Sequence, residues 1–154
     1  MATPPQVDFG ILLGLAYQEV VRGLRATLAA AGFTDLGRSD GFVFRALAGR
    51  PRTVSDLAVR LHITKQGAAQ IVADMERRGY VVRVPDPDDR RAKLVQLSDR
   101  GRRALAAARA FHATYERRLV RTHGKDRVAA LRELLDGIAG GGEGVDPELR
   151  PLYL

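Results

Sequence analysis

The chain has 154 residues and suits a single domain over 1–154, long enough to bury a hydrophobic core without disulfides or metals. It contains no cysteine, which excludes thiol redox sensing, cysteine nucleophiles and zinc–thiolate sites. Its net charge is +7, and residues 1–123 carry 21 basic and 12 acidic side chains. This distribution favours a polyanionic partner such as nucleic acid.

The first predicted element is a helix over residues 7–31, which contains no proline and ends before Gly32. Its first half, FGILLGLAY, is apolar nearly all the way round, so a single packing face cannot satisfy it. We therefore expect this helix to contact a second neighbour, a role that another subunit would fill.

Three short helices are expected next, each beginning after a hydroxyl side chain that can cap it. Ser39 precedes DGFVFRALA, and Thr53 precedes VSDLAVRLH. Thr64 precedes KQGAAQIVADMERR, which stops at Gly79. The tight turn HIT joins the last two of these helices, which is the layout of a helix-turn-helix.

The segments YVVRV and KLVQL are β-branched or alternating, and PDPDD between them supplies turn chemistry, so they predict a β-hairpin. Ser98 then caps a long alanine-rich helix, which a break at THG separates from a last helix, KDRVAALRELLDGIA. The glycine-rich tail 140–154 is expected to be flexible. The predicted fold class is mainly α with a small β-hairpin.

The helix over 64–78 carries an unusual exposed face. At 100° per residue, Ala68, Ile71, Val72 and Met75 share one side, and Gln66, Gln70, Ala73 and Arg77 share the other. Glutamine can bond adenine bidentately in the major groove, and small neighbours such as Gly67 allow the backbone to approach closely. Lys65 at the helix start would contact phosphate or guanine, and the capping residue Thr64 is counted with it among the DNA-binding residues. The alternative interpretation is a polar face that is merely solvated.

The hairpin tip, DPDDRRAK, places aspartates directly before basic residues. A carboxylate can hold a neighbouring guanidinium in one orientation, and an oriented arginine can enter a narrow minor groove. We predict that Asp89 orients Arg91 in this way, and that Arg90 and Lys93 contact phosphates. The alternative is a mixed-charge turn exposed for solubility.

These residues together resemble the MarR-type winged helix-turn-helix regulators. The pattern is carried by Met75, Glu76, Gly79, Tyr80, Val81, Asp89, Arg90, Arg91, Ser98 and Gly101, and the element order extends the resemblance over residues 7–139. The resemblance implies a DNA-binding lobe over 39–97 and a homodimer held by 7–32 and 98–139. It further implies a transcriptional regulator, most often a repressor, whose recognition helices read successive major grooves of a pseudo-palindromic operator.

The chain departs from the family pattern at three positions. Gly67 stands where many members have Ser or Thr, Gln70 where many have Arg or Asn, and Ser98 where the helix cap is usually Thr. The first two positions bear on which operator bases are read, because both lie on the recognition helix.

Many members of the family release DNA when a small aromatic or phenolic effector binds between the dimerisation region and the reading lobe. Residues that would line such a pocket lie on the first, second and fifth helices: Tyr17, Arg22, Phe42, Phe44, Phe111, His112 and Tyr115. The alternative is that these aromatic side chains are ordinary core.

No P-loop, GxSxG, HExxH or dinucleotide-binding glycine pattern is present, so the sequence predicts neither an enzyme nor a cofactor. The three histidines lack metal-ligand spacing, and no metal site is expected. No segment approaches the length of a membrane span, and we expect a soluble cytoplasmic protein. Two alternatives to operator reading stay open: a winged-helix protein-interaction module and a nonspecific DNA-binding protein.

Overall fold

A computed structural model describes residues 7–89 and 91–140 of the chain. Within them, helices and two antiparallel strands follow in the order α1 (Phe9–Ala30), α2 (Asp40–Leu47), α3 (Val54–Arg60), α4 (Lys65–Arg77), β1 (Val81–Pro85), β2 (Lys93–Leu97), α5 (Asp99–His123) and α6 (Lys125–Ala139). The predicted fold class, mainly helical with a small β-hairpin, is confirmed. The predicted flexible tail, apart from Gly140, lies outside the described residues.

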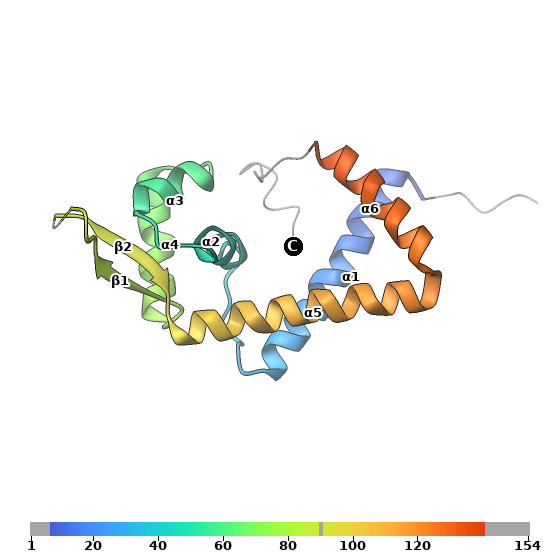
Figure 1. Cartoon of the computed structure of the whole chain (residues 1–154), viewed down its shortest axis with the longest axis horizontal. Coiled ribbons are helices and arrows are strands. Elements are labelled where there is room, and N and C mark those ends of the chain that lie inside the picture. The colour runs from blue at the N-terminus through green and yellow to red at the C-terminus, as the bar shows by residue number, and fades with distance from the viewer. Residues whose placement is uncertain (1–6, 90, 141–154) are drawn as a thin grey trace, which may run out of the picture.

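The elements form two parts connected by one long helix (Figure 1). The hairpin and α2 to α4 make a compact lobe, from which α5 extends to the opposite end of the molecule. There α1 crosses α5, and α6 folds back and contacts α5. The chain therefore passes between the parts twice, once through the linker 31–39 and once along α5, whose start lies in the lobe.

The lobe is built around one hydrophobic cluster to which each of its elements contributes. Its members from the helices and the hairpin are Val43, Phe44, Leu47, Leu57, Leu61, Val72, Met75, Tyr80, Val81, Val95, Leu97 and Ala104. Because Ala104 belongs to α5, the beginning of that helix is part of the lobe core. The hairpin is thus packed against the helices by its inward-facing side chains.

Three of the four predicted helix caps are present. The hydroxyl oxygens of Thr53, Thr64 and Ser98 each accept a hydrogen bond from the amide three residues later, at 3.1, 3.0 and 3.0 Å. Each bond satisfies an N–H group that the first helical turn leaves unpaired. The predicted starts of these three helices are therefore confirmed. They could be predicted because a cap depends on only a few consecutive residues.

The predicted cap at Ser39 is wrong. Ser39 has helical dihedral angles and its side chain makes no capping hydrogen bond. Instead, the Asp40 carboxylate accepts a bond of 2.8 Å from the Gly37 backbone N–H. Asp40 is only 2% exposed and is also paired with Arg78, so the first residue of α2 is held by a tertiary contact.

Arg52 ties the hairpin to the helices. Its backbone exchanges hydrogen bonds of 3.0 and 2.7 Å with Val95 of β2. Its guanidinium donates to the Ala46 carbonyl at 2.6 Å and to the Asp56 carboxylate at 2.7 Å. The middle of β2 is therefore fixed to the end of α2 and the start of α3.

Candidate nucleic-acid interface

The two faces of α4 are divided as the sequence predicted. Ala68, Val72 and Met75 are buried in the lobe, and Ile71 is half-buried. The opposite face is open to solvent along its length: Gln66, Gln70, Ala73 and Arg77. The helix therefore presents two amides and one guanidinium, separated by small residues, at the surface of the lobe.

The helix cap at Thr64 explains the glycine at position 67. It is the third residue of α4, and its N–H donates to the Thr64 hydroxyl. A Cβ at this position would lie 3.2 Å from that same oxygen and 3.8 Å from the Ile63 side chain. A larger residue would press on the helix cap, so Gly67 alone does not indicate close approach of DNA.

A shallow groove runs beside α4, between this helix and the loop that precedes α2. Its lining residues are Gly37–Asp40, Ile63, Thr64, Gly67, Gln70, Ile71, Ala73, Asp74, Arg77 and Arg78. Within it, Arg78 is paired with Asp40 and Asp74, and Arg77 with Asp74. Gln70 and Arg77 therefore lie at the edge of a concave surface that combines apolar side chains with paired charges.

Asp89 has a different role from the one predicted. Its carboxylate accepts the backbone N–H of Arg91 at 2.9 Å, and Asp86 accepts that of Asp88 at the same distance. Aspartate commonly bonds the amide two residues on, which stabilises a turn. Among the described residues, no ion pair joins Asp89 to the Arg91 guanidinium. The aspartates shape the hairpin tip and leave the Arg91 side chain unrestrained by them.

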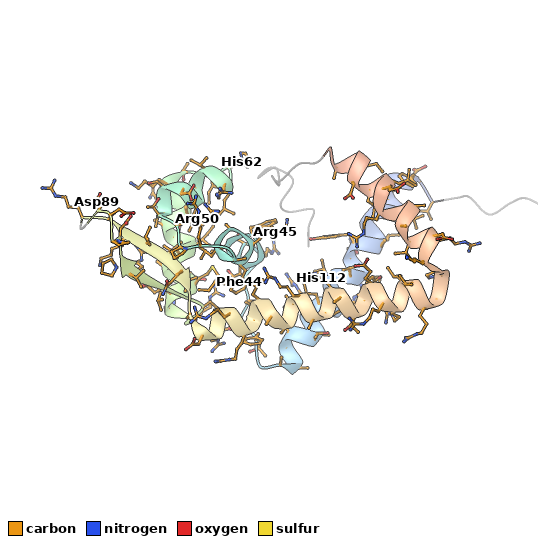
Figure 2. The ribbon with its side chains drawn as sticks, viewed as in Figure 1. Phe44, Arg45, Arg50, His62, Asp89 and His112 are labelled. Atoms are coloured by element: carbon orange, nitrogen blue, oxygen red, sulfur yellow. The ribbon has the colours of Figure 1, made fainter. Side chains whose placement is uncertain are left out.

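The hairpin tip is the outermost part of the lobe, as the position of Asp89 in Figure 2 shows. Arg91 and Lys93 are exposed there, and Lys65 is exposed at the start of α4. In the part of the chain that the structure describes, these three cations have no carboxylate partner. Their charge is therefore available to an external anion. Arg90, the fourth predicted DNA contact of the tip, lies outside the described residues.

A cluster around Tyr80 was not found from the sequence. The Tyr80 ring is fully buried, and its hydroxyl donates to the Asp35 carboxylate at 2.5 Å. Arg100 donates to the same carboxylate oxygen at 2.9 Å and lies over the ring, 4.7 Å from its centroid. Residues separated by 45 and 65 positions thus meet, a juxtaposition that no local pattern signals.

The cluster shifts two pKa values in opposite directions. The hydrogen bond from Tyr80, together with the charge of Arg100, holds the pKa of Asp35 below its ordinary value of 3.8. Burial and the neighbouring Asp35 raise the pKa of Tyr80 above 10.0. The folded state therefore favours ionised Asp35 and neutral Tyr80.

Stability should consequently depend on pH at both extremes. The contribution of Asp35 is present above pH 3.8 and is lost as the pH falls. The contribution of Tyr80 is present below pH 10.0 and is lost as the pH rises through its raised pKa. Melting temperatures of wild type and Tyr80→Phe should differ most near neutral pH, and the difference should narrow at both extremes. A difference independent of pH would contradict this account.

The residues predicted to line an effector pocket are not all brought together. Phe44 is buried in the lobe core, edge-on to Tyr80 at 5.7 Å, because it lies on the inward face of α2. Phe111 instead contacts His112 and Tyr115, with ring centroids 5.4 and 5.8 Å apart. Phe44 and His112 lie apart in Figure 2.

The other three predicted pocket residues are also dispersed. Phe42 packs beside the lobe core, Tyr17 is exposed on α1, and Arg22 is paired with Glu19 on the surface of the same helix. The effector pocket stays a prediction.

Two negative observations apply to the described ranges 7–89 and 91–140. They contain no group of three or more histidine, aspartate and glutamate side chains placed to hold a metal ion. They also contain no helix with the length and apolar character required to cross a membrane.

Sequence comparison relates the lobe to known regulators. The model of the MarR family matches residues 34–92. The transcriptional activatory protein BadR of Rhodopseudomonas palustris is 35% identical over 80 residues, which are 52% of this chain and 46% of BadR. The transcriptional regulator HosA of Escherichia coli O111:H- is 37% identical over 75 residues, 48% of this chain and 56% of HosA. The matches span about half the length of these curated relatives.

Comparison with solved structures extends the similarity to most of the chain. The transcriptional repressor CouR, bound to a 23-mer DNA duplex, is 30% identical, with a TM-score of 0.63 over 86% of this chain and 92% of CouR. FabT of Streptococcus pneumoniae, in complex with DNA, shares the fold at 19% identity and a TM-score of 0.74, over 85% of this chain and 92% of FabT. With the family match over the lobe and CouR similar across both parts of the fold, this chain belongs to the MarR family.

Proposed function

We propose that this chain is a homodimeric transcriptional regulator that binds double-stranded DNA in a sequence-specific manner, most simply as a repressor. The observation that carries the proposal is the exposed face of α4, where Gln66, Gln70 and Arg77 project from a helix whose other side is anchored in the lobe core. A rigidly held helix with polar side chains on one face can enter the major groove and bond base edges.

The hairpin supplies the second contact. Arg91 is proposed to enter the minor groove, and Lys93 and Arg90 to contact phosphates. Asp86 and Asp89 support this role by holding the backbone of the tip, so that the tip approaches DNA in a defined shape. Lys65 would contact a phosphate from the start of α4, where the Thr64 cap fixes the backbone.

Dimerisation is supported by apolar side chains that the single chain leaves in solvent. Those on α1 are Phe9, Ile11, Leu12 and Leu15, and those on α6 are Leu131, Leu134, Leu135 and Ile138, with exposures from 41 to 65%. Soluble monomers rarely expose apolar surface on this scale, and a second copy is the partner that would bury both helices. Two lobes would then read half-sites about one helical turn, roughly 34 Å, apart on a pseudo-palindromic operator.

Release by a small aromatic effector is a secondary part of the proposal. It is supported by the contact of Phe111 with His112 and Tyr115, on the stretch of α5 that packs against α1. Movement of this packing would be transmitted along α5 to the lobe.

The proposed wing contact is tested by comparing Arg91→Ala with Arg109→Ala, which removes an equal charge from the exposed surface of α5. Fluorescence anisotropy would measure binding to a duplex from the region upstream of the chain's own gene. Arg91→Ala is expected to weaken binding by about 1–3 kcal/mol. Arg109→Ala should cause only the smaller change due to screened long-range charge.

Equal losses in the two variants would contradict a specific role for Arg91. If both variants and the wild type bind a shuffled duplex as tightly as the upstream duplex, the protein is a nonspecific DNA binder. If none of them binds DNA, the protein-interaction alternative is favoured.

A further inference from the structure

The two covalent connections between the lobe and the α1–α5–α6 part meet at one point. The first is the linker 31–39, which contains Asp35. The second is α5, whose start lies in the lobe core and contains Arg100 as the second helical residue. Asp35 and Arg100 are paired at 2.9 Å, so the two connections are tied directly to each other.

The Asp35–Arg100 ion pair, called the tie below, also contacts the lobe core. Tyr80, fully buried immediately before β1, donates its hydroxyl to the Asp35 oxygen that also accepts from Arg100. Arg100 stacks over the Tyr80 ring, and its buried Nε has no hydrogen-bond partner among the described residues. The guanidinium is therefore held in place by the ring, the hydroxyl and Asp35.

The end of the recognition helix joins the same cluster. Arg78, the residue at the C-terminal end of α4, donates to the backbone carbonyl of Asp35 at 2.7 Å. It also donates to the carboxylates of Asp40, at 2.6 Å, and Asp74, at 2.9 Å. Arg78 is largely buried and its pKa is raised by Asp40, so it stays charged. Asp35 thus contacts α4, the lobe core and α5 at once.

From this geometry we infer that Asp35 is a positioning residue that fixes the angle of the reading lobe on the dimerisation helices, and so determines which half-site spacing the dimer accepts. With the tie in place, the linker and α5 move as one body. Without it, the linker can move independently of the start of α5, which stays packed in the lobe core. The lobe is then held to the dimerisation helices by α5 alone, and each recognition helix can reach a wider range of positions. This inference rests on the proposed function.

The variant to test is Asp35→Asn, with Asp99→Asn as the matched control. Both replace an aspartate that pairs with an arginine in the first turn of α5, Arg100 for Asp35 and Arg102 for Asp99. Both change the net charge by the same amount. Only Asp35 links the two connections, because the Asp99 pair lies within α5.

Binding would be measured on a pseudo-palindromic duplex selected by the wild type, and on versions with one base pair inserted or deleted between the half-sites. Wild type and Asp99→Asn should lose affinity on the order of tenfold, about 1.4 kcal/mol, for the altered spacings. Asp35→Asn should bind the original and altered duplexes within about threefold of each other, because the lobe adjusts to both. A duplex carrying a single half-site should be bound equally by all three proteins.

The outcomes separate the inference from the proposed function. If the wild type selects no sequence, the proposed function fails. If it selects an operator and Asp35→Asn discriminates spacing as sharply as Asp99→Asn, the inference is overturned. Should Asp35→Asn fail to fold, Arg100→Gln against Arg102→Gln removes the same tie from the other side, and the same comparison of spacings decides.

Discussion

Replacing Gly101 by alanine is expected to lower the free energy of unfolding by about 3 kcal/mol, the upper end of the usual cost of overpacking a buried site. An added Cβ at Gly101 would lie 2.1 Å from the Tyr80 carbonyl oxygen. That oxygen also accepts the Ser98 N–H at 3.0 Å, so it cannot turn away without losing a hydrogen bond. Instead, α5 would have to move away from the start of the hairpin. Urea denaturation followed by circular dichroism would measure the loss.

Gly137→Ala is the control for this prediction. Gly137 lies inside α6, and an added Cβ there meets nothing within 4 Å. The substitution should raise stability by up to about 1 kcal/mol, because alanine is the better helix former. Both variants must be compared at one protein concentration, since the proposed dimerisation would contribute to stability. Similar effects at Gly101 and Gly137 would show that the contact with Tyr80 does not constrain α5.

The double variant Leu134→Glu, Ile138→Glu is expected to convert the proposed dimer into a monomer. The two residues are 65 and 61% exposed and lie one helical turn apart on α6. Burying two carboxylates at a subunit interface without partners is strongly unfavourable. Because a monomer engages only one half-site, affinity for the operator should fall by about 100-fold or more.

Analytical ultracentrifugation would measure the oligomeric state, and anisotropy would measure operator binding. The conservative change Leu134→Met keeps the site apolar and should preserve both the dimer and its affinity. A wild type that sediments as a monomer at micromolar concentration, or a double variant that remains dimeric, would contradict the proposed use of this surface.

Features that depend on neighbouring residues were predicted well from the sequence. The caps at Thr53, Thr64 and Ser98 and the division of α4 into a buried and an exposed face follow from short-range spacing. The hairpin was predicted from two β-forming segments around a proline- and aspartate-rich turn, and the strands pair from Val81 with Leu97 to Pro85 with Lys93. Each of these features is fixed by fewer than about twenty consecutive residues.

Features that depend on distant residues were missed or assigned differently. Asp35, Tyr80 and Arg100 carry no common local pattern, and only the folded chain brings them together. Ser39 has a capping residue type, but the buried Asp40 determines the local geometry. Asp89 bonds the Arg91 amide rather than its side chain, since this bond orders only the short Asp89 side chain and leaves the rotamers of the long Arg91 side chain free.

The central claim, sequence-specific binding of duplex DNA, is tested most directly with the wild-type protein alone. A labelled duplex from the upstream region and a shuffled duplex of equal composition would be titrated by anisotropy at two salt concentrations. A sequence-specific DNA-binding protein should bind the upstream duplex more tightly and lose affinity steeply as salt rises, because phosphate contacts release counterions. Equal affinity for the two duplexes, or binding that is absent even at low salt, would contradict the central claim.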